Sequence, residues 1–299
     1  MRIATDSFSN SLMAQIQSLS AQQTQYQQEL ATGDRITNPS DDPAAVNQVL
    51  NLGSQLQSLQ QYSSNNAVAT QITQQSYSAL SNLQTISTTA GELATEGGSG
   101  TTSATSYQAY SQQLNQLVQQ ALQTANSQFN GNYLFGGTQT NTPPFTATYD
   151  ASGNITGVTY TGTSAGASIQ TGQGSIVSPY TTGATNQQIA GFLNNLVALS
   201  NAMNSQSASA VQAAQPALNT SDDNILSAVS GIGAIQSGLQ ADETLNQSAF
   251  TSLQGLVSND TSTDVATTTV QLTQAQTAYQ AALEAGAKIM QTSLLNYLN

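Results

Sequence analysis

The chain of 299 residues contains no cysteine and no histidine. Disulfide frameworks and metal sites built from thiolates or imidazoles are therefore excluded. Nucleophiles that rely on a histidine base are excluded as well. No spacing of carboxylates suggests a reaction either, so the sequence predicts a protein that is not an enzyme and holds no metal or cofactor.

Charge is scarce, since only 6% of the residues are charged, against about 25% in ordinary soluble proteins. Three cations, Arg2, Arg35 and Lys288, stand against fifteen carboxylates and leave a net charge of -12. Nucleic acids and anionic membranes are bound by clustered cations, so neither is an expected partner. Weakly charged surfaces favour close packing of many copies, although an ordinary protein of low charge is the alternative.

Long apolar runs are also absent. The N-terminal residues lack the apolar core of about seven to fifteen residues that a secretory signal peptide contains. No stretch approaches the roughly twenty apolar residues that cross a bilayer. If the protein is exported to the cell exterior, we expect a route without a cleaved signal peptide.

What the chain does contain is a stripe of apolar residues, in steps of three and four, near each end. Such steps place side chains along one face of a helix. A narrow stripe cannot bury itself on an isolated helix, so each end needs the other end or another molecule as a partner. We predict that the two stripes form an assembly interface, which comprises Phe8, Leu12, Ile16, Leu19, Tyr26, Leu30, Val265, Leu272, Tyr279, Leu283, Met290, Leu294 and Leu298.

Between these ends, helical spacing flanks one block rich in glycine, threonine and serine, whose alternating residues predict β-hairpins. The expected fold is mainly α with a small β insertion: an elongated antiparallel helical bundle or coiled coil with paired N- and C-terminal helices. The expected domains are a terminal coiled coil (1–43 plus 263–299), a long helical bundle (44–132 plus 184–262) and a β-rich outer domain (133–183).

A break separates the first two predicted helices. Pro43 suits the first position of a helix, and either Ser40 or Asp42 can cap that helix. Adjacent carboxylates do not share a helix face, which disfavours a metal or acid–base role for Asp41 and Asp42. We therefore predict a hinge and cap formed by Pro39, Asp41, Asp42 and Pro43.

Two further acidic pairs are also predicted to cap helices. Asp222 and Asp223 are expected to lie where a helix begins, close to the positive end of its dipole. Asp260 and Asp264 precede the C-terminal stripe and are expected to cap its helix, although they could also bracket a cation.

Three blocks of residues resemble the flagellin superfamily. They are Leu30-Ala31-Thr32-Gly33-Asp34-Arg35 with Asn38-Pro39-Ser40-Asp41-Asp42-Pro43-Ala44-Ala45, Asn132-Tyr133-Leu134-Phe135-Gly136-Gly137-Thr138 with Pro143-Pro144-Phe145, and Ala278-Tyr279-Gln280-Ala281-Ala282-Leu283 through Ser293-Leu294-Leu295-Asn296-Tyr297-Leu298. Flagellins usually lack the two prolines of the first block. The closer likeness within the superfamily is therefore to the hook-filament junction proteins, although Asn296 stands where that family often has aspartate.

This resemblance implies a structural component of the bacterial flagellum, which joins the hook to the flagellin filament through its terminal helices. The implied partners are the first hook-associated protein, flagellin, other copies of the chain in a helical ring, and an export chaperone on the C-terminal helix. Export through the flagellar type III apparatus is implied as well. A flagellin-type filament subunit and a secreted adhesin or hydrolase outside flagella remain the alternatives.

Overall fold

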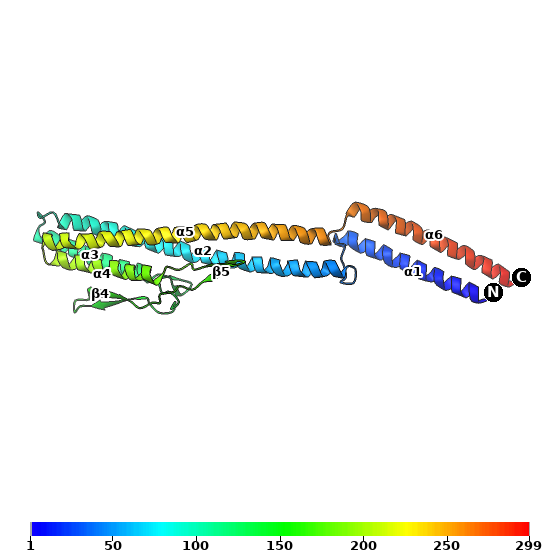
Figure 1. Ribbon diagram of the computed structural model, residues 1–299, viewed down its shortest axis with the longest axis horizontal. Coiled ribbons are helices and arrows are strands. Elements are labelled where there is room, and N and C mark those ends of the chain that lie inside the picture. The colour runs from blue at the N-terminus through cyan, green and yellow to red at the C-terminus, as the bar shows by residue number, and fades with distance from the viewer. Residues whose placement is uncertain (1, 299) are drawn as a thin grey trace. The chain divides into compact units, whose positions relative to one another are not determined.

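In the computed structural model, the backbone of residues 2–298 and the side chains of residues 10–288 are described. Six helices and six short strands follow one another in this part of the chain, so the predicted fold class is confirmed. The helices are α1 (Arg2–Thr32), α2 (Pro43–Gly97), α3 (Ala104–Ala125), α4 (Gly183–Asn204), α5 (Ala208–Thr261) and α6 (Val265–Leu298) (Figure 1). The strands are β1 (Gln128–Phe129), β2 (Asn132–Tyr133), β3 (Phe145–Tyr149), β4 (Ile155–Tyr160), β5 (Ile169–Gly172) and β6 (Ser175–Val177).

The chain divides into two compact units. The terminal unit contains residues 1–58 and 250–299, and the central unit contains residues 59–249. Helices α2 and α5 each contribute residues to both units. The three domains expected from the sequence stay a prediction.

In the terminal unit, α1 and α6 lie side by side, as the pairing of the two ends predicts (Figure 1). Helix α1 ends at Thr32 because Gly33 adopts a φ of 78°, and the Gly33 N–H donates to the Glu29 carbonyl at 2.9 Å. A glycine with positive φ is the usual way to close a helix. Pro43 then begins α2, at the first helical position where its missing N–H costs nothing.

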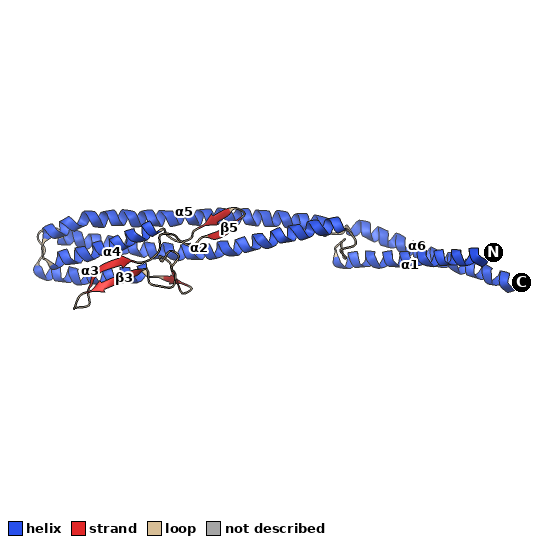
Figure 2. Ribbon diagram, turned by 60° about the horizontal axis from the view of Figure 1, so that its bottom comes forward, coloured by secondary structure: helices blue, strands red, loops and turns tan. Residues whose placement is uncertain are grey.

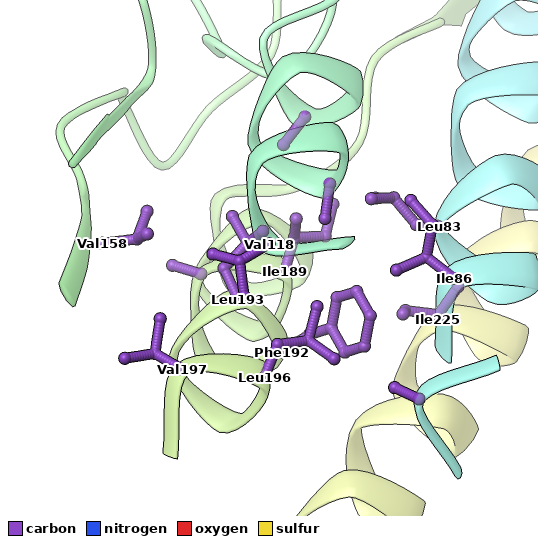
Figure 3. Close-up of a cluster of buried hydrophobic side chains, with 14 of the residues drawn as sticks. Leu83, Ile86, Val118, Val158, Ile189, Phe192, Leu193, Leu196, Val197 and Ile225 are labelled. Atoms are coloured by element: carbon purple, nitrogen blue, oxygen red, sulfur yellow. The ribbon is translucent and has the colours of Figure 1, made fainter. Parts of the chain in front are cut away.

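The central unit has one hydrophobic core between α2, α3, α4 and α5. Figure 3 shows Leu83 and Ile86 of α2 facing Phe192 of α4, with Ile225 of α5 nearby. Phe192 and Leu83 are completely buried, and burial of such a side chain stabilises the fold by about 1.5–3 kcal/mol. The apolar spacing of the interior helices therefore predicts a core that the structure contains.

The predicted hairpins are present, as three separate two-stranded antiparallel sheets (Figure 2). The β3–β4 pair packs on α4, and its Phe145 and Val158 belong to the core of the helices. The Asn194 side chain accepts from the Val158 N–H and donates to the Val158 carbonyl, both at 2.8 Å. Asn126 makes the same pair of bonds to Phe145, at 3.1 and 2.9 Å. Side-chain amides from the helices thus satisfy the outer edges of this sheet, where a third strand would otherwise be needed.

Gly137, in the second block of the family resemblance, has a φ of 70° in a tight turn. A Cβ atom there would lie 2.7 Å from the Thr163 carbonyl oxygen and 2.9 Å from that of Ala165. We expect Gly137→Ala to lower the free energy of unfolding of the central unit by about 2–4 kcal/mol, because backbone strain and overpacking add. Urea unfolding followed by circular dichroism measures this change.

Gly153→Ala is the matched control, since Gly153 has a φ of 83° but no atom within 4 Å of its Cβ position. This variant carries the strain of a positive φ without the collision, so its loss should be about 1 kcal/mol. Equal losses in the two variants would show that the close approach of Gly137 to Thr163 does not matter.

Two predictions about helix limits are wrong. Asp222 and Asp223 lie inside α5, which begins earlier, at Ala208, with the Ser207 hydroxyl accepting from the Ala210 N–H at 3.3 Å. Serine is a strong cap and fixes the start there. The three–four spacing of apolar residues from Tyr107 to Phe129 predicts one continuous helix, but α3 ends at Ala125 and Phe129 lies in β1.

Candidate assembly interface

The predicted apolar residues of α1 that the structure describes lie on one side of the helix. They are half-buried, as expected for the face that packs on α6, and comprise Leu12, Ile16, Leu19, Tyr26 and Leu30. Glu29, on the same side, is only 5% exposed, and its carboxylate accepts a hydrogen bond from the Gln25 amide at 3.0 Å. These α1 residues therefore share the face that packs on α6, and their role in an assembly interface stays a prediction.

The face of α6 that packs against α1 consists of smaller residues than predicted. Thr268 and Ala275 are buried, and a Cβ on Gly286 would lie 3.0 Å from Cδ2 of Leu12. Small residues let two helices approach closely, and the larger Leu272 and Tyr279 are half-buried beside them. The packed face of α6 is thus rotated slightly from the stripe predicted for it.

This rotation leaves two predicted residues outside the contact between α1 and α6. Val265 is 59% exposed and Leu283 is 45% exposed. The remaining members of the predicted interface, Phe8, Met290, Leu294 and Leu298, lie outside the described side chains. Whether any of these positions contacts another molecule stays a prediction.

The terminal unit has almost no core of its own. Among its described side chains, the only buried hydrophobic ones are Leu52 and Ala275. Large apolar side chains are instead exposed on it, namely Met13, Leu50, Leu256, Val265, Val270 and Leu283. Exposed apolar surface of this kind marks sites of protein association.

The segments that follow α1 and precede α6 are bonded to each other through their backbones. The Arg35 N–H donates to the Thr261 carbonyl at 2.6 Å, and the Thr263 N–H donates to the Gly33 carbonyl at 2.9 Å. Asp34 and Ser262 form an isolated antiparallel bridge between these bonds. This short ladder holds the start of α6 beside the end of α1 and fixes the register of the pair.

Arg35 adds side-chain bonds at the same place. Its guanidinium forms an ion pair with Asp42 at 3.2 Å and donates to the Asp260 carbonyl at 2.9 Å. One side chain thereby links the cap of α2 to the end of α5. The contribution of the ion pair is small because both side chains are partly exposed.

The predicted hinge residues act in different ways. Asp42 caps α2, since its carboxylate accepts from the Ala45 N–H at 3.1 Å. Asp41 closes the preceding turn, because it accepts from the N–H groups of Thr37 and Asn38 at 3.1 and 2.7 Å. Pro39 is exposed within this turn. At the other end, Asp264 caps α6 and accepts from the Ala266 N–H at 3.0 Å.

These bonds stabilise the ionised carboxylates. Hydrogen bonds from the Asn38 N–H and from Thr37 lower the pKa of Asp41 below its ordinary 3.8. The Ala45 N–H, followed by Arg35, lowers the pKa of Asp42. The Thr267 hydroxyl and the N–H groups of Thr267 and Ala266 lower the pKa of Asp264.

Because these pKa values are lower in the folded state, the caps stabilise the fold above about pH 3.8, and this contribution is lost as the pH falls through the folded values. We expect the hydrogen-exchange protection factors of the Asn38 and Ala45 amides to drop between pH 5 and pH 3. The Gly33 amide, which donates to a carbonyl rather than a carboxylate, is the internal control. A uniform change at all three amides would count against the caps as the acid-sensitive groups.

Sequence reasoning missed Thr268, Ala275 and Arg35 as interface residues. The first two follow the three–four spacing that also contains Leu272, but small side chains carry little weight in an apolar pattern. Two partners of Arg35, the carbonyls of Asp260 and Thr261, lie far along the chain, so no local signal identifies these bonds. Within the described side chains, no group of three acidic, histidine or cysteine residues could hold a metal ion. No helix of residues 2–298 is both long and apolar enough to cross a membrane.

The geometry is that of a helical protein whose two terminal helices pair, and known proteins with this arrangement are similar to the chain. Residues 3–140, nearly half of the chain, match the family described as the bacterial flagellin N-terminal helical region. The flagellar hook-associated protein 3 of Salmonella typhimurium is 34% identical over 146 residues, which make up 48% of this chain and 46% of the relative. The match thus spans about half the length of this relative.

Solved structures show the same fold. A Vibrio parahaemolyticus chain assigned to the flagellar hook-associated proteins has a TM-score of 0.66 at 20% identity, over 74% of this chain and all of that one. Bacillus cereus FlgL has a TM-score of 0.59 at 18% identity, over 70% of this chain and 99% of the other. These structures confirm the fold, and the resemblance drawn from the sequence motifs is confirmed by the matches to the flagellin N-terminal helical region and to flagellar hook-associated protein 3.

Proposed function

We propose that this chain is a structural, non-catalytic subunit of the bacterial flagellum that joins the hook to the flagellin filament. The observation that carries the proposal is the pair of terminal helices, α1 and α6, which pack through half-buried residues while Val265 and Leu283 stay exposed. The similarity to the Salmonella relative, flagellar hook-associated protein 3, supports the same role.

The partners that this role requires are the first hook-associated protein on one side, flagellin on the other, and neighbouring copies in a helical ring. The exposed apolar side chains of the terminal unit would be buried against these subunits. Burial of apolar area contributes about 25 cal/mol per Å², which is the main source of free energy available to a unit with so small a core. The low charge of the chain lets copies approach with little repulsion.

The proposal also covers how the protein reaches the flagellum. We expect export to the extracellular flagellum without a cleaved signal peptide, and a cytosolic chaperone that covers the C-terminal helix before export. A helix with exposed apolar side chains, such as Val270 and Leu283 of α6, is a surface that a chaperone would protect from premature association.

The test is sedimentation of the purified full-length protein in two settings, with electron microscopy of the pellets. Under salting-out conditions that polymerise flagellins, we expect the protein to stay out of long filaments. Mixed with isolated hooks that carry the first hook-associated protein, it should bind to the hook ends. Regular filaments would make the chain a flagellin-type filament subunit, and neither filaments nor hook binding would place it outside flagella.

A further inference from the structure

A groove runs along α2 and α5 in the central unit, with a volume of about 680 Å³. This volume is within the range of about 300–1,000 Å³ that is usual for binding sites. Ala67 and Leu239 supply apolar lining, and Gln71, Gln240 and Glu243 supply polar groups. The groove is therefore suited to a segment that is partly apolar and can also donate hydrogen bonds.

Asn66, which also lines the groove, has a buried acceptor without a donor. Its side chain is 2% exposed, and its amide nitrogen donates to the Leu239 carbonyl at 2.8 Å and to the Glu243 carboxylate at 3.1 Å. Its Oδ1 atom has no partner among the described residues. A buried acceptor left unpaired costs free energy, so a donor that enters the groove would be favoured.

The β5–β6 hairpin is attached to the same stretch of α2 and α5, but on another side. Asp242 accepts from the hydroxyls of Thr171 and Ser175 at 2.6 and 2.8 Å, and the Asn246 amide donates to the Thr171 carbonyl at 2.7 Å. Successive helical residues are rotated by about 100°, so Asp242 and the groove residue Glu243 point in different directions. The hairpin and the groove residues thus lie at one level on different sides of the two helices. Figure 2 shows the hairpin beside α2 and α5.

The hairpin presents an apolar side chain to its surroundings. Side chains alternate along a strand, so Ile176 points away from the face on which Ser175 bonds to Asp242, and it is 68% exposed. Residues 169–177 carry no charge. Gln173, between the strands, has an amide that can donate. In a chain with a net charge of -12, such an uncharged surface is where two copies meet with least repulsion.

We propose that the β5–β6 hairpin of one copy occupies the α2–α5 groove of the next copy, with Ile176 against Ala67 and Leu239 and a hairpin amide donating to Asn66 Oδ1. The proposal rests on the proposed assembly of neighbouring copies. Because two different surfaces of one chain meet, the contact is heterologous and generates a ring or an open helix instead of a closed twofold dimer.

The absence of cysteine allows a direct test by disulfide trapping in the full-length chain. Single variants Ile176→Cys and Ala67→Cys are mixed under salting-out conditions with a mild oxidant, and products are separated on non-reducing gels. We expect a heterodimer at a yield about tenfold or more above that of a control pair, because docking raises the local concentration of the two thiols. The control pair is Ala67→Cys with Tyr149→Cys, since Tyr149 is exposed on the β3–β4 hairpin.

The double variant Ala67→Cys/Ile176→Cys should give a ladder of oligomers, which a closed dimer cannot give. Yields equal to the control pair, or Ile176→Cys homodimers alone, would overturn the proposal. Hook binding of the same variants under reducing conditions distinguishes failure of the hairpin–groove contact from failure of the proposed junction function. Hook binding without specific trapping overturns only the hairpin contact, whereas a lack of hook binding by the unmodified chain overturns the proposed function as well.

Discussion

A chain that ends at Asp264 should fold its central unit normally and fail completely to assemble. The buried hydrophobic cluster of that unit extends from Ile72 to Ile232 and contains no residue of α6. Without α6, however, the half-buried face of α1 has lost the helix it packs against. An isolated helix of this kind is marginal in water, so α1 should also lose most of its order.

Two measurements check this expectation. Circular dichroism should show the main thermal transition of the full-length protein with a midpoint that is almost unchanged, together with a lower helix content. Co-sedimentation with hooks should show no binding at concentrations where the full-length chain saturates them. Loss of the main transition would contradict the independence of the two units, and normal binding would remove the terminal helices from the assembly interface.

Replacement of Leu283 by aspartate should weaken hook binding about a hundredfold without a change in thermal stability. Leu283 is 45% exposed beside the packed face of α6, so a carboxylate there remains hydrated in the free protein. In the assembled state the same carboxylate would be buried without a partner, which costs about 3 kcal/mol and weakens binding about a hundredfold. Titration of hooks with labelled protein measures this difference.

Two variants on the same helix serve as controls for this prediction. Gln274→Asp adds the same charge at an exposed position and should bind normally. Leu272→Asp lies in the contact with α1 and should reduce the order of the terminal unit as well as binding. If Gln274→Asp weakened binding as much as Leu283→Asp, the loss would reflect added charge rather than a buried contact.

The fold could be predicted to a large extent because its signals are local. Gly33 and Pro43 mark the end of one helix and the start of the next through backbone conformations that few other residues adopt as readily. The change from helical to alternating spacing places the β3–β4 and β5–β6 hairpins correctly, but β1 (Gln128–Phe129) lies in a stretch predicted as helical. The prediction that Asp222 and Asp223 begin a helix is wrong because an acidic pair gives the same local sequence signal at the start of a helix and in the interior of a long one.

The candidate interface was predicted less completely. The α1 stripe consists of large apolar residues and agrees with the structure, but the packed face of α6 uses Thr268, Ala275 and Gly286. An apolar pattern gives weight to size, whereas close helix contact requires small side chains. The pattern therefore placed Val265 and Leu283 in the stripe, although they lie outside the contact with α1.

The elements and their order follow largely from the sequence, because helix caps, periodicity and composition depend on neighbours along the chain. Only the tertiary structure decided which side of α6 faces α1, which residues bond the two ends at Arg35, and where the β5–β6 hairpin lies relative to the groove at Asn66. These features depend on contacts between residues that lie 67 or more positions apart. Their geometry is set by side-chain volume and by the pairing of polar groups that become buried only after the helices have packed.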